Sequence, residues 1–300
     1  MLVKTHLDKT GREVSCFTSN YPGQAWFKSF MKRHKSALSP RMCQNIAPKR
    51  AQISAETIKE YFSNLKETLK DIPPSHIINY DETNLTDDPG RKKCIYPRGC
   101  KYPERMLAST KSAISLMFAG TACGQVLPPY VVYKSEHLWD TWTTGGPTGT
   151  RYGRSKNGWF DTASFEDWFK TIALPYFRKL EGDKVLLGDN LSSHINEDVI
   201  NLCSKHNIKF VCLPPNATHI CQPLDVAFFR PLKMKWRQIL SEWKKKNRSA
   251  LVSKDCFPRL LKKLMTAIES RQEENLQAGF RKCGIVPFNP DTVLASIPDE

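Results

Sequence analysis

The 300-residue sequence lacks a long apolar run: none approaches the roughly 18 consecutive apolar residues that a membrane-spanning helix needs. The opening segment, Met1–His6, also lacks the apolar centre of a secretory signal peptide. Internal repeats at the spacing of solenoid proteins are absent as well. We therefore expect a protein that stays inside the cell, does not enter a membrane and is not a repeat array.

Cysteine is not scarce, but the spacings that bind zinc are missing. A zinc knuckle usually has about two to four residues between its paired cysteines. More residues separate Cys94 from Cys100, and the later cysteines are more widely spaced still. Without a secretory signal, the 10 cysteines of a chain this long are typical of reduced thiols. We expect neither a structural zinc site nor a disulfide framework.

Acidic residues are in short supply: 45 Lys and Arg face 30 Asp and Glu, which gives a formal net charge of +15. Such a balance predicts a polyanionic partner, either nucleic acid or an anionic membrane surface, and charge alone does not choose between the two. Hydrophobic residues make up 40% of the chain and include 7 Trp and 15 Phe, enough for a globular core rather than a disordered polymer.

The N-terminal part of the chain predicts helices. Apolar residues recur at helical spacing with basic residues between them across Trp26–His34, and Ser39-Pro40 ends that pattern. The stretch 41–54 shows no strong periodicity and is interpreted as a linker. A second helix is expected over Ala55–Leu69, closed by Asp71 and a pair of prolines.

From residue 76 the pattern changes to short strands. The first, His76–Tyr80, ends on Asp81. Two further runs, 112–119 and 126–133, flank a turn with two glycines and predict a hairpin. The Gly-rich stretch 143–158 is too polar to be core and is interpreted as a loop.

Helix and strand then alternate. The expected elements are helix 164–180, strand Lys184–Leu187 running into Asp189, helix 196–206, strand 208–213 and two closing helices, 224–247 and 257–279. Because the later strands need crossover helices, they lie parallel to their neighbours. The sequence therefore predicts an α/β fold: a ribonuclease H-like mixed sheet flanked by helices, with a small helical N-terminal segment.

Three aspartates hold positions where ligand sites form. Asp81 and Asp189 each follow an apolar strand, at the sheet edge where parallel α/β folds place ligands, and Asp225 opens the helix after the last strand. Converging carboxylates raise one another's pKa unless a cation neutralises them, and hard oxygen ligands suit Mg²⁺ or Mn²⁺. Two such ions about 4 Å apart would activate an attacking water or 3′-hydroxyl and stabilise the leaving oxygen. Taken singly, each Asp is also typical of a turn or an N-cap.

Long segments around these acids resemble the DDE superfamily endonucleases of the pogo and Tigger type, relatives of the Tc1/mariner transposases. The segments are Asn79–Asn84, Gly188–His194, Leu213–Asp225 and Gly279–Pro290, in the family's order. The resemblance extends from about residue 76 to 290. It implies a ribonuclease H-like fold, a transposase activity on double-stranded DNA and a metal cofactor.

Carried over by position, Asp81, Asp189 and Asp225 are the catalytic and metal-binding triad, with Mg²⁺ or Mn²⁺ as cofactor. The third member is Asp where other branches of the family use Glu. Candidate supporting residues, which would orient a ligand, a water or a phosphate, are Asn190, His194, His219 and Gln222. A lone histidine such as His194 near a helix start is also typical of a cap or surface residue, and Glu82 stays open as a further ligand.

Basic residues crowd the helix that begins at Asp225. DNA contacts are expected there from Arg230, Lys233, Lys235 and Arg237. A helix that leads away from a metal site with this charge would hold the phosphate backbone without reading sequence. The alternative is a solvated face with no partner. The run Lys244–Arg248 is also a candidate nuclear import signal.

The segment Trp26–Arg41 is similar to the last helix of the centromere protein B type helix-turn-helix, which precedes the catalytic domain in this family. Its candidate DNA-binding residues are Trp26, Lys28, Lys32, Arg33 and Arg41. Since only one end of such a module is visible, we expect a shortened N-terminus that binds specific DNA poorly. An ordinary amphipathic helix packed on the domain is the alternative.

The sequence thus predicts three parts: residues 1–54 as a helix-turn-helix remnant with a linker, 55–250 as the catalytic domain, and 251–300 as a helical extension and tail. The leading hypothesis is a nuclear DNA transposase or transposase-derived endonuclease that works as a homodimer in a synaptic complex, with no membrane partner. The second is a host-recruited DNA-binding protein that keeps the fold without transposition. A nuclease acting on RNA hybrids fits the fold but not the motifs.

Overall fold

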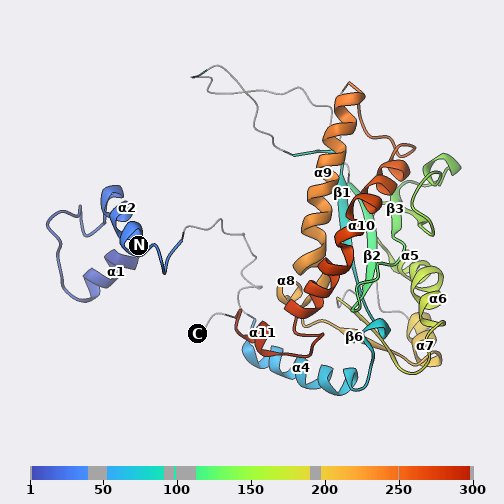
Figure 1. The fold of residues 1–300 in the computed structure, drawn as a ribbon, viewed down its shortest axis with the longest axis horizontal. Coiled ribbons are helices and arrows are strands. Elements are labelled where there is room, and N and C mark those ends of the chain that lie inside the picture. Colours follow the sequence, from blue (N-terminus) through green and yellow to red (C-terminus); the bar gives the residue numbers. More distant parts are fainter. Residues whose placement is uncertain are drawn as a thin grey trace. The chain divides into compact units, whose positions relative to one another are not determined.

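The structure, a computed structural model, describes residues 2–39, 53–90, 98, 113–189, 197–248 and 250–297. Three of the predicted site residues, Arg41, Asn190 and His194, lie outside the described residues. The chain divides into two compact units, Met1–Ala47 and Pro48–Glu300 (Figure 1). Residues 251–297 therefore belong to the same unit as the sheet.

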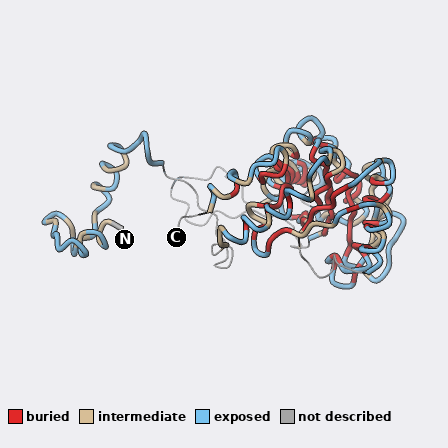
Figure 2. The backbone as a smooth tube through the Cα atoms, turned by 90° about the horizontal axis from the view of Figure 1, so that it is seen from below, coloured by how far each residue is buried: buried red, intermediate tan, exposed pale blue. Residues whose placement is uncertain are grey.

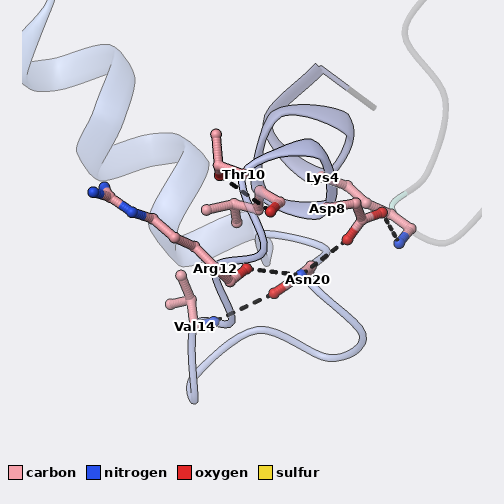
Figure 3. Close-up of polar contacts among 7 residues, drawn as sticks. Lys4, Asp8, Thr10, Arg12, Val14 and Asn20 are labelled. Atoms are coloured by element: carbon pink, nitrogen blue, oxygen red, sulfur yellow. Dashed lines mark hydrogen bonds and ion pairs between the residues drawn. The ribbon is translucent and has the colours of Figure 1, made fainter.

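The N-terminal unit contains two helices, α1 (Leu2–Lys9) and α2 (Gln24–Arg33). α2 confirms the helix that the spacing predicts, whereas the pattern does not predict α1. Asn20 holds the connection between them: its Nδ2 donates to Asp8 Oδ1 at 2.9 Å and to the Arg12 carbonyl at 3.1 Å (Figure 3). Asn20 has a φ of 61°, in the left-handed region that asparagine enters more readily than most residues.

Aromatic rings, rather than a buried core, hold the N-terminal unit together. Trp26 stacks on Phe30 with 5.0 Å between ring centroids and meets the edge of Phe17 at 5.6 Å. None of the residues 3–39 is buried, and Figure 2 shows this unit in the colours of exposed and intermediate residues. The Trp26 ring is thus engaged in packing, while the basic side chains of α2 are exposed.

The second unit is built on a six-stranded sheet in the order β4-β3-β2-β1-β5-β6. The strands are β1 (Ile77–Thr86), β2 (Ala113–Thr121), β3 (Tyr130–Lys134), β4 (Arg151–Ser155), β5 (Lys184–Gly188) and β6 (Ile208–Cys212). β1, β2 and β3 form an antiparallel meander, which confirms the predicted hairpin. β5 and β6 are parallel to β1, as the crossover argument predicts.

Two strands differ from the prediction. β1 does not end at Asp81 but continues to Thr86, because every residue of this second half pairs with β2. The Gly-rich segment 143–158 is not only a loop: it contains the edge strand β4, parallel to β3, whose Tyr152 packs on the core beside Tyr133. A short, polar edge strand carries too little apolar pattern to be recognised from sequence.

Helices cover both faces of the sheet. Their bounds, with short turns included, are α4 (Ala55–Leu69), η1 (Pro74–His76), η2 (Asp140–Trp142), α5 (Thr162–Trp168), η3 (Phe169–Ala173), α6 (Leu174–Phe177), α7 (Glu197–Lys205), α8 (Thr218–Cys221), η5 (Leu224–Phe228), α9 (Phe229–Lys246), α10 (Phe257–Lys282) and α11 (Asp291–Leu294). α4 has the predicted bounds, and its N-cap Ser54 accepts the Thr57 N–H at 3.2 Å. Within the described chain, no helix has both the length and the apolarity to cross a bilayer.

The core of this unit has three parts. The first packs α5, η3, α6 and α7 on one face of the sheet, with Tyr80 and Trp168 among its buried rings. The second packs α9 and α10 on the opposite face around Phe118 and Trp236. The third joins α4, α8 and the C-terminal segment to β1 and β5. β1, which carries Asp81, therefore contributes residues to all three parts.

Gly188 ends β5 and leads directly into Asp189. A Cβ atom at this position would lie 2.2 Å from the ring of Tyr80, a contact that real side chains do not make. Tyr80 is fully buried and packs on Phe165 and Trp168, so the ring has no free space to enter. Glycine at this position lets β5 approach the aromatic core of β1.

We expect Gly188→Ala to lower the free energy of unfolding by about 1–3 kcal/mol, the usual cost of overpacking a core. Urea denaturation followed by circular dichroism measures the change. Ser63→Ala, at an exposed position of α4, is the control and should change stability by less than about 0.5 kcal/mol. Equal stability of Gly188→Ala and the wild type would contradict the packing of Tyr80 on β5.

Candidate active site

Asp81 and Asp189 occupy matching positions on one face of the sheet. β1 and β5 are parallel with Asn79 opposite Leu187, and each aspartate comes two residues later. Side chains two residues apart in a strand point to the same face, and neighbouring strands are about 4.8 Å apart. The two carboxylates therefore share the edge at which β5 ends, although β1 itself continues.

Strand alternation separates Glu82 from this edge. Glu82 follows Asp81, so its side chain points to the opposite face, where its register partner Met117 belongs to the core beneath α5 and α7. The Glu82 backbone N–H donates to Asp81 Oδ1 at 2.8 Å. Glu82 thus orients the Asp81 carboxylate through its backbone and does not add an oxygen on the same face.

A buried pair of amides connects β1 to the loop before the third acid. Asn79 and Gln222 both have no exposed surface. Asn79 Nδ2 donates to the Leu187 carbonyl at 3.0 Å and to Gln222 Oε1. Gln222 Nε2 donates to the Tyr80 carbonyl at 3.1 Å. One amide pair therefore joins β1, β5 and this loop.

The same pair fixes the backbone that carries Asp225. The Leu224 N–H donates to Asn79 Oδ1 at 3.2 Å, so the residue before Asp225 is bonded to β1. α10 closes on the loop from the other side, where a Cβ at Gly279 would lie 2.5 Å from the Pro223 carbonyl oxygen. Asp225 itself lies in the first turn of η5 and is exposed.

The three aspartates interact electrostatically. Burial raises the pKa of Asp81 well above its ordinary value, and the negative charges of Asp225 and Asp189 raise it further, against the opposing effect of the Glu82 N–H. Burial and the charge of Asp189 also raise the pKa of the Cys212 thiol at the end of β6. The edge therefore concentrates negative charge, which a bound cation would neutralise.

No three His, Cys, Asp or Glu side chains among the described residues lie close enough together to form a ready-made metal site. The chemistry of the donors nevertheless suits a hard divalent cation, because all three are carboxylates, and burial together with the charges of Asp225 and Asp189 raises the pKa of Asp81. The residues present therefore fit Mg²⁺ or Mn²⁺ as donors, and binding would require their side chains to converge.

Residues 111–280 match the family model of the DDE superfamily endonuclease, and this range contains Asp189 and Asp225. The chain belongs to the DDE superfamily endonucleases. The family predicted from the sequence motifs is thereby confirmed. Asp81 precedes the matched range, so its place in the site rests on the register of β1 with β5 and on its electrostatic interaction with the other two acids.

Curated relatives of this DDE endonuclease chain include pogo transposable elements with a KRAB domain. The human protein is 28% identical over 187 residues, which cover 58% of this chain and 29% of the human protein. The mouse protein is 24% identical over 287 residues, which cover 87% of this chain and 44% of the mouse protein. A protein named MFS-type transporter clz9, from Cochliobolus lunatus, is 25% identical over 210 residues, covering 69% and 21%. The chain spans less than half the length of these relatives.

Solved structures of Mos1 transposase share the fold. The Mos1 strand transfer complex has a TM-score of 0.57 at 13% identity, covering 100% of this chain and 74% of that chain. A pre-cleavage Mos1 transpososome has a TM-score of 0.55 at 14% identity, covering 100% and 75%. The ribonuclease H-like mixed sheet predicted from the order of elements is confirmed.

Two of the four predicted supporting residues of the endonuclease site can be placed. Gln222 is buried in the amide pair, so it positions the backbone before Asp225. His219 lies on α8 and is half-buried, and its Nδ1 has no hydrogen-bond partner among the described residues. Asn79 was not a candidate, although a polar residue inside an apolar strand is the signal that identifies it.

The four basic candidates on α9 fall on two sides of the helix. At 3.6 residues per turn, Arg230, Lys233 and Arg237 share one side and Lys235 lies on another. A Cβ at Gly90, just after β1, would lie 4.0 Å from the Arg237 side chain. Lys235 instead lines a groove between α9 and α10. The predicted basic patch is therefore two separate surfaces.

The amide pair gives a double-mutant test. We expect Gln222→Met to lower the free energy of unfolding by about 1–3 kcal/mol, because buried partners lose their hydrogen bonds, and Asn79→Leu to act in the same way. The double variant should lose clearly less unfolding free energy than the sum of the two single losses, because it removes both partners of one buried hydrogen bond. Urea denaturation of the four proteins measures this. Strict additivity would contradict the contact.

Removing one charge from the acid edge should stabilise the metal-free protein. We expect Asp81→Asn to raise the Tm at about pH 7, because burial and two neighbouring charges destabilise the ionised carboxylate. Each kcal/mol relieved corresponds to about 2–4 °C. Thermal melting in EDTA checks this, with Asp255→Asn, an exposed aspartate before α10, as the control that should leave the Tm unchanged. A lower Tm for Asp81→Asn would contradict the repulsion.

Proposed function

We propose that this chain is the catalytic part of a DNA transposase, or of an endonuclease derived from one, in which Asp81, Asp189 and Asp225 hold two Mg²⁺ or Mn²⁺ ions. The observation that supports this most directly is the shared acid edge. Two of the acids continue one register on parallel strands, and a buried amide pair bonds the residue before the third to β1. Membership in the DDE endonucleases gives the edge its reaction class, the breaking and joining of phosphodiester bonds.

The chain's own contribution is to hold oxygen ligands on a rigid frame. β1 and β5 fix the backbones of Asp81 and Asp189, and Asn79 with Gln222 fixes the backbone before Asp225. A bound metal pair supplies an activated water or 3′-hydroxyl and stabilises the leaving oxygen of an in-line displacement. His219, together with Asn190 and His194, would orient a water or a phosphate at this edge.

We assign backbone contacts with double-stranded DNA to Arg230, Lys233 and Arg237, which share one side of α9; on that side the Arg237 side chain lies next to Gly90. In the N-terminal unit, the exposed side chains of α2 and the following segment are the candidates: Lys28, Lys32, Arg33 and Arg41. Trp26 would support α2 from within, because its ring packs on Phe17 and Phe30.

The Mos1 relatives suggest how the DNA would be arranged. They were solved as a pre-cleavage transpososome and as a paired-end complex with Mn. We extend this arrangement to the present chain: transposon ends as substrate, a homodimer that pairs two of them, and the nucleus as the compartment in which the DNA is met.

A second candidate is a DNA-binding protein that keeps the fold and no longer transposes. The observation that favours it is the set of exposed basic side chains on α2 and α9, which would bind phosphates without a metal ion. The two candidates differ in one measurable property, metal-dependent cleavage.

Cleavage of DNA that carries candidate transposon ends tests the proposal. We expect the full chain to cut in Mg²⁺ or Mn²⁺ and not in EDTA. Asp189→Asn should lower the rate at least about 100-fold, since the loss of a metal ligand exceeds the 10–100-fold cost of losing an outer partner. Asp255→Asn, which removes the same charge from an exposed loop, should cut like the wild type. DNA binding without cleavage in every protein would favour the second candidate.

A further inference from the structure

A groove follows the seam between α9 and α10 on the side away from the sheet. The two helices lie side by side on one face of the sheet and run in opposite directions (Figure 1). Two hollows of about 290 and 360 Å³ open along the seam and share Lys235, Gln238 and Ala267. They therefore form one continuous track, which we call the α9–α10 groove.

Positive charge dominates the α9–α10 groove. Its cations are Lys235 and Lys246 from α9 and Lys263 and Arg271 from α10. The lining residues include one carboxylate, Glu242, which accepts a hydrogen bond from Gln238 Nε2 at 3.0 Å. In the part of the chain that the structure describes, no salt bridge involves any of the four cations. The described lining residues therefore carry four positive charges against one negative charge.

The floor of the groove argues against an amphipathic helix as its occupant. A docked helix buries a wide apolar stripe, yet Leu260 is 2% exposed and Ile239 and Ile268 are each 8% exposed. The large apolar lining side chains that are open to solvent are Met234, at 61% exposure, and the half-buried Trp243, two separate side chains rather than a wide stripe. A polyanion needs only cations spaced along a line, which is what the groove presents.

We propose that the α9–α10 groove binds the phosphate backbone of DNA outside the cleavage site. This inference rests on the proposed function, because DNA is the polyanion on which the acid edge would act. α9 follows directly on η5, which contains Asp225, and its 18 residues span about 27 Å at 1.5 Å per residue. A duplex along the helix would reach about eight base pairs from the acid edge, at 3.4 Å for each.

The groove and the arginine side of α9 would hold the duplex at different places. Lys235 and Lys246 line the groove beside α10, whereas Arg230 and Arg237 share another side of α9, on which the Arg237 side chain lies next to Gly90. Contacts to phosphates are independent of base sequence. The groove would therefore add affinity for any DNA that extends past the acid edge, and it would not choose the sequence.

The test measures how DNA affinity depends on salt. The full chain in EDTA, where no cutting takes place, is titrated onto a fluorescent duplex of about 30 base pairs between about 50 and 200 mM salt. The groove variant carries Lys235→Gln, Lys246→Gln, Lys263→Gln and Arg271→Gln. Each phosphate contact contributes about 0.9 to the slope of log affinity against log salt, so the slope should fall by about three to four.

A control variant separates this groove from net charge. The control variant carries Lys59→Gln, Lys66→Gln, Lys70→Gln and Lys179→Gln. These remove the same charge from exposed positions on α4, at its C-cap and after α6, and the variant should keep the wild-type slope. Thermal melting checks that both variants are folded. The pair Lys263→Gln with Arg271→Gln, both at exposed positions, provides a milder variant whose slope should fall by about two.

Two results would overturn the proposal: a groove variant with the wild-type slope, or equal losses in the groove and control variants. Lost binding to polyglutamate with an unchanged DNA slope would assign the groove to an acidic polypeptide and overturn it as well. No metal or cleavage enters this measurement. An unchanged salt slope therefore says nothing about cleavage by the wild type or Asp189→Asn. Likewise, absence of cleavage does not affect the salt slope of the groove variant.

Discussion

The hydrogen bonds between Asn79 and Gln222 are the contact on which the geometry of the acid edge depends. Asp81 and Asp189 need no separate support, because the ladder between β1 and β5 sets their register. Asp225 lies outside the sheet, and the hydrogen bond from the Leu224 N–H to Asn79 ties the backbone before it to β1. Amides suit this position because each can donate and accept without adding charge to an already negative site. A carboxylate in place of either would increase the repulsion that raises the pKa of Asp81.

Concentrating three acids at one edge costs stability, and close packing around the edge offsets part of that cost. Gly188 brings β5 against the buried ring of Tyr80, and Gly279 brings α10 against the carbonyl of Pro223. Gly188 directly precedes Asp189, and Gly279 contacts Pro223, which lies two residues before Asp225. The protein thus keeps an electrostatically unfavourable edge on a frame that has little room to relax, as is usual for functional sites.

The sequence predicts the parts of this structure that depend on local pattern. Helix Ala55–Leu69 follows from its N-cap and apolar spacing, and β5 follows from a short apolar run before Gly188. The prediction that β1 ends at Asp81 is wrong because a polar residue inside a strand resembles a strand end until the partner strand is known. β4 is missed for a related reason, since its five residues are mostly polar.

Contacts between distant parts of the chain lie beyond such patterns. Asn79 and Gln222 are 143 positions apart, and nothing in the periodicity around either one indicates the other. Asp225 could be proposed from sequence only through the family motif around it, because a single acid near a helix start is more often a cap. The register that aligns Asp81 with Asp189 likewise needs the sheet, although both acids could be named without it.

The basic helix α9 shows how the fold changes the meaning of a charge count. In the sequence its cations form one patch, and helical periodicity already places Lys235 apart from Arg230 and Arg237. Periodicity cannot say which neighbour each side will have. That neighbour is α10, which brings Lys263 and Arg271 from a separate helix to the side of Lys235. Because α9 begins at the acid edge and α10 returns along it, cations from two helices form one line that leads away from the acids.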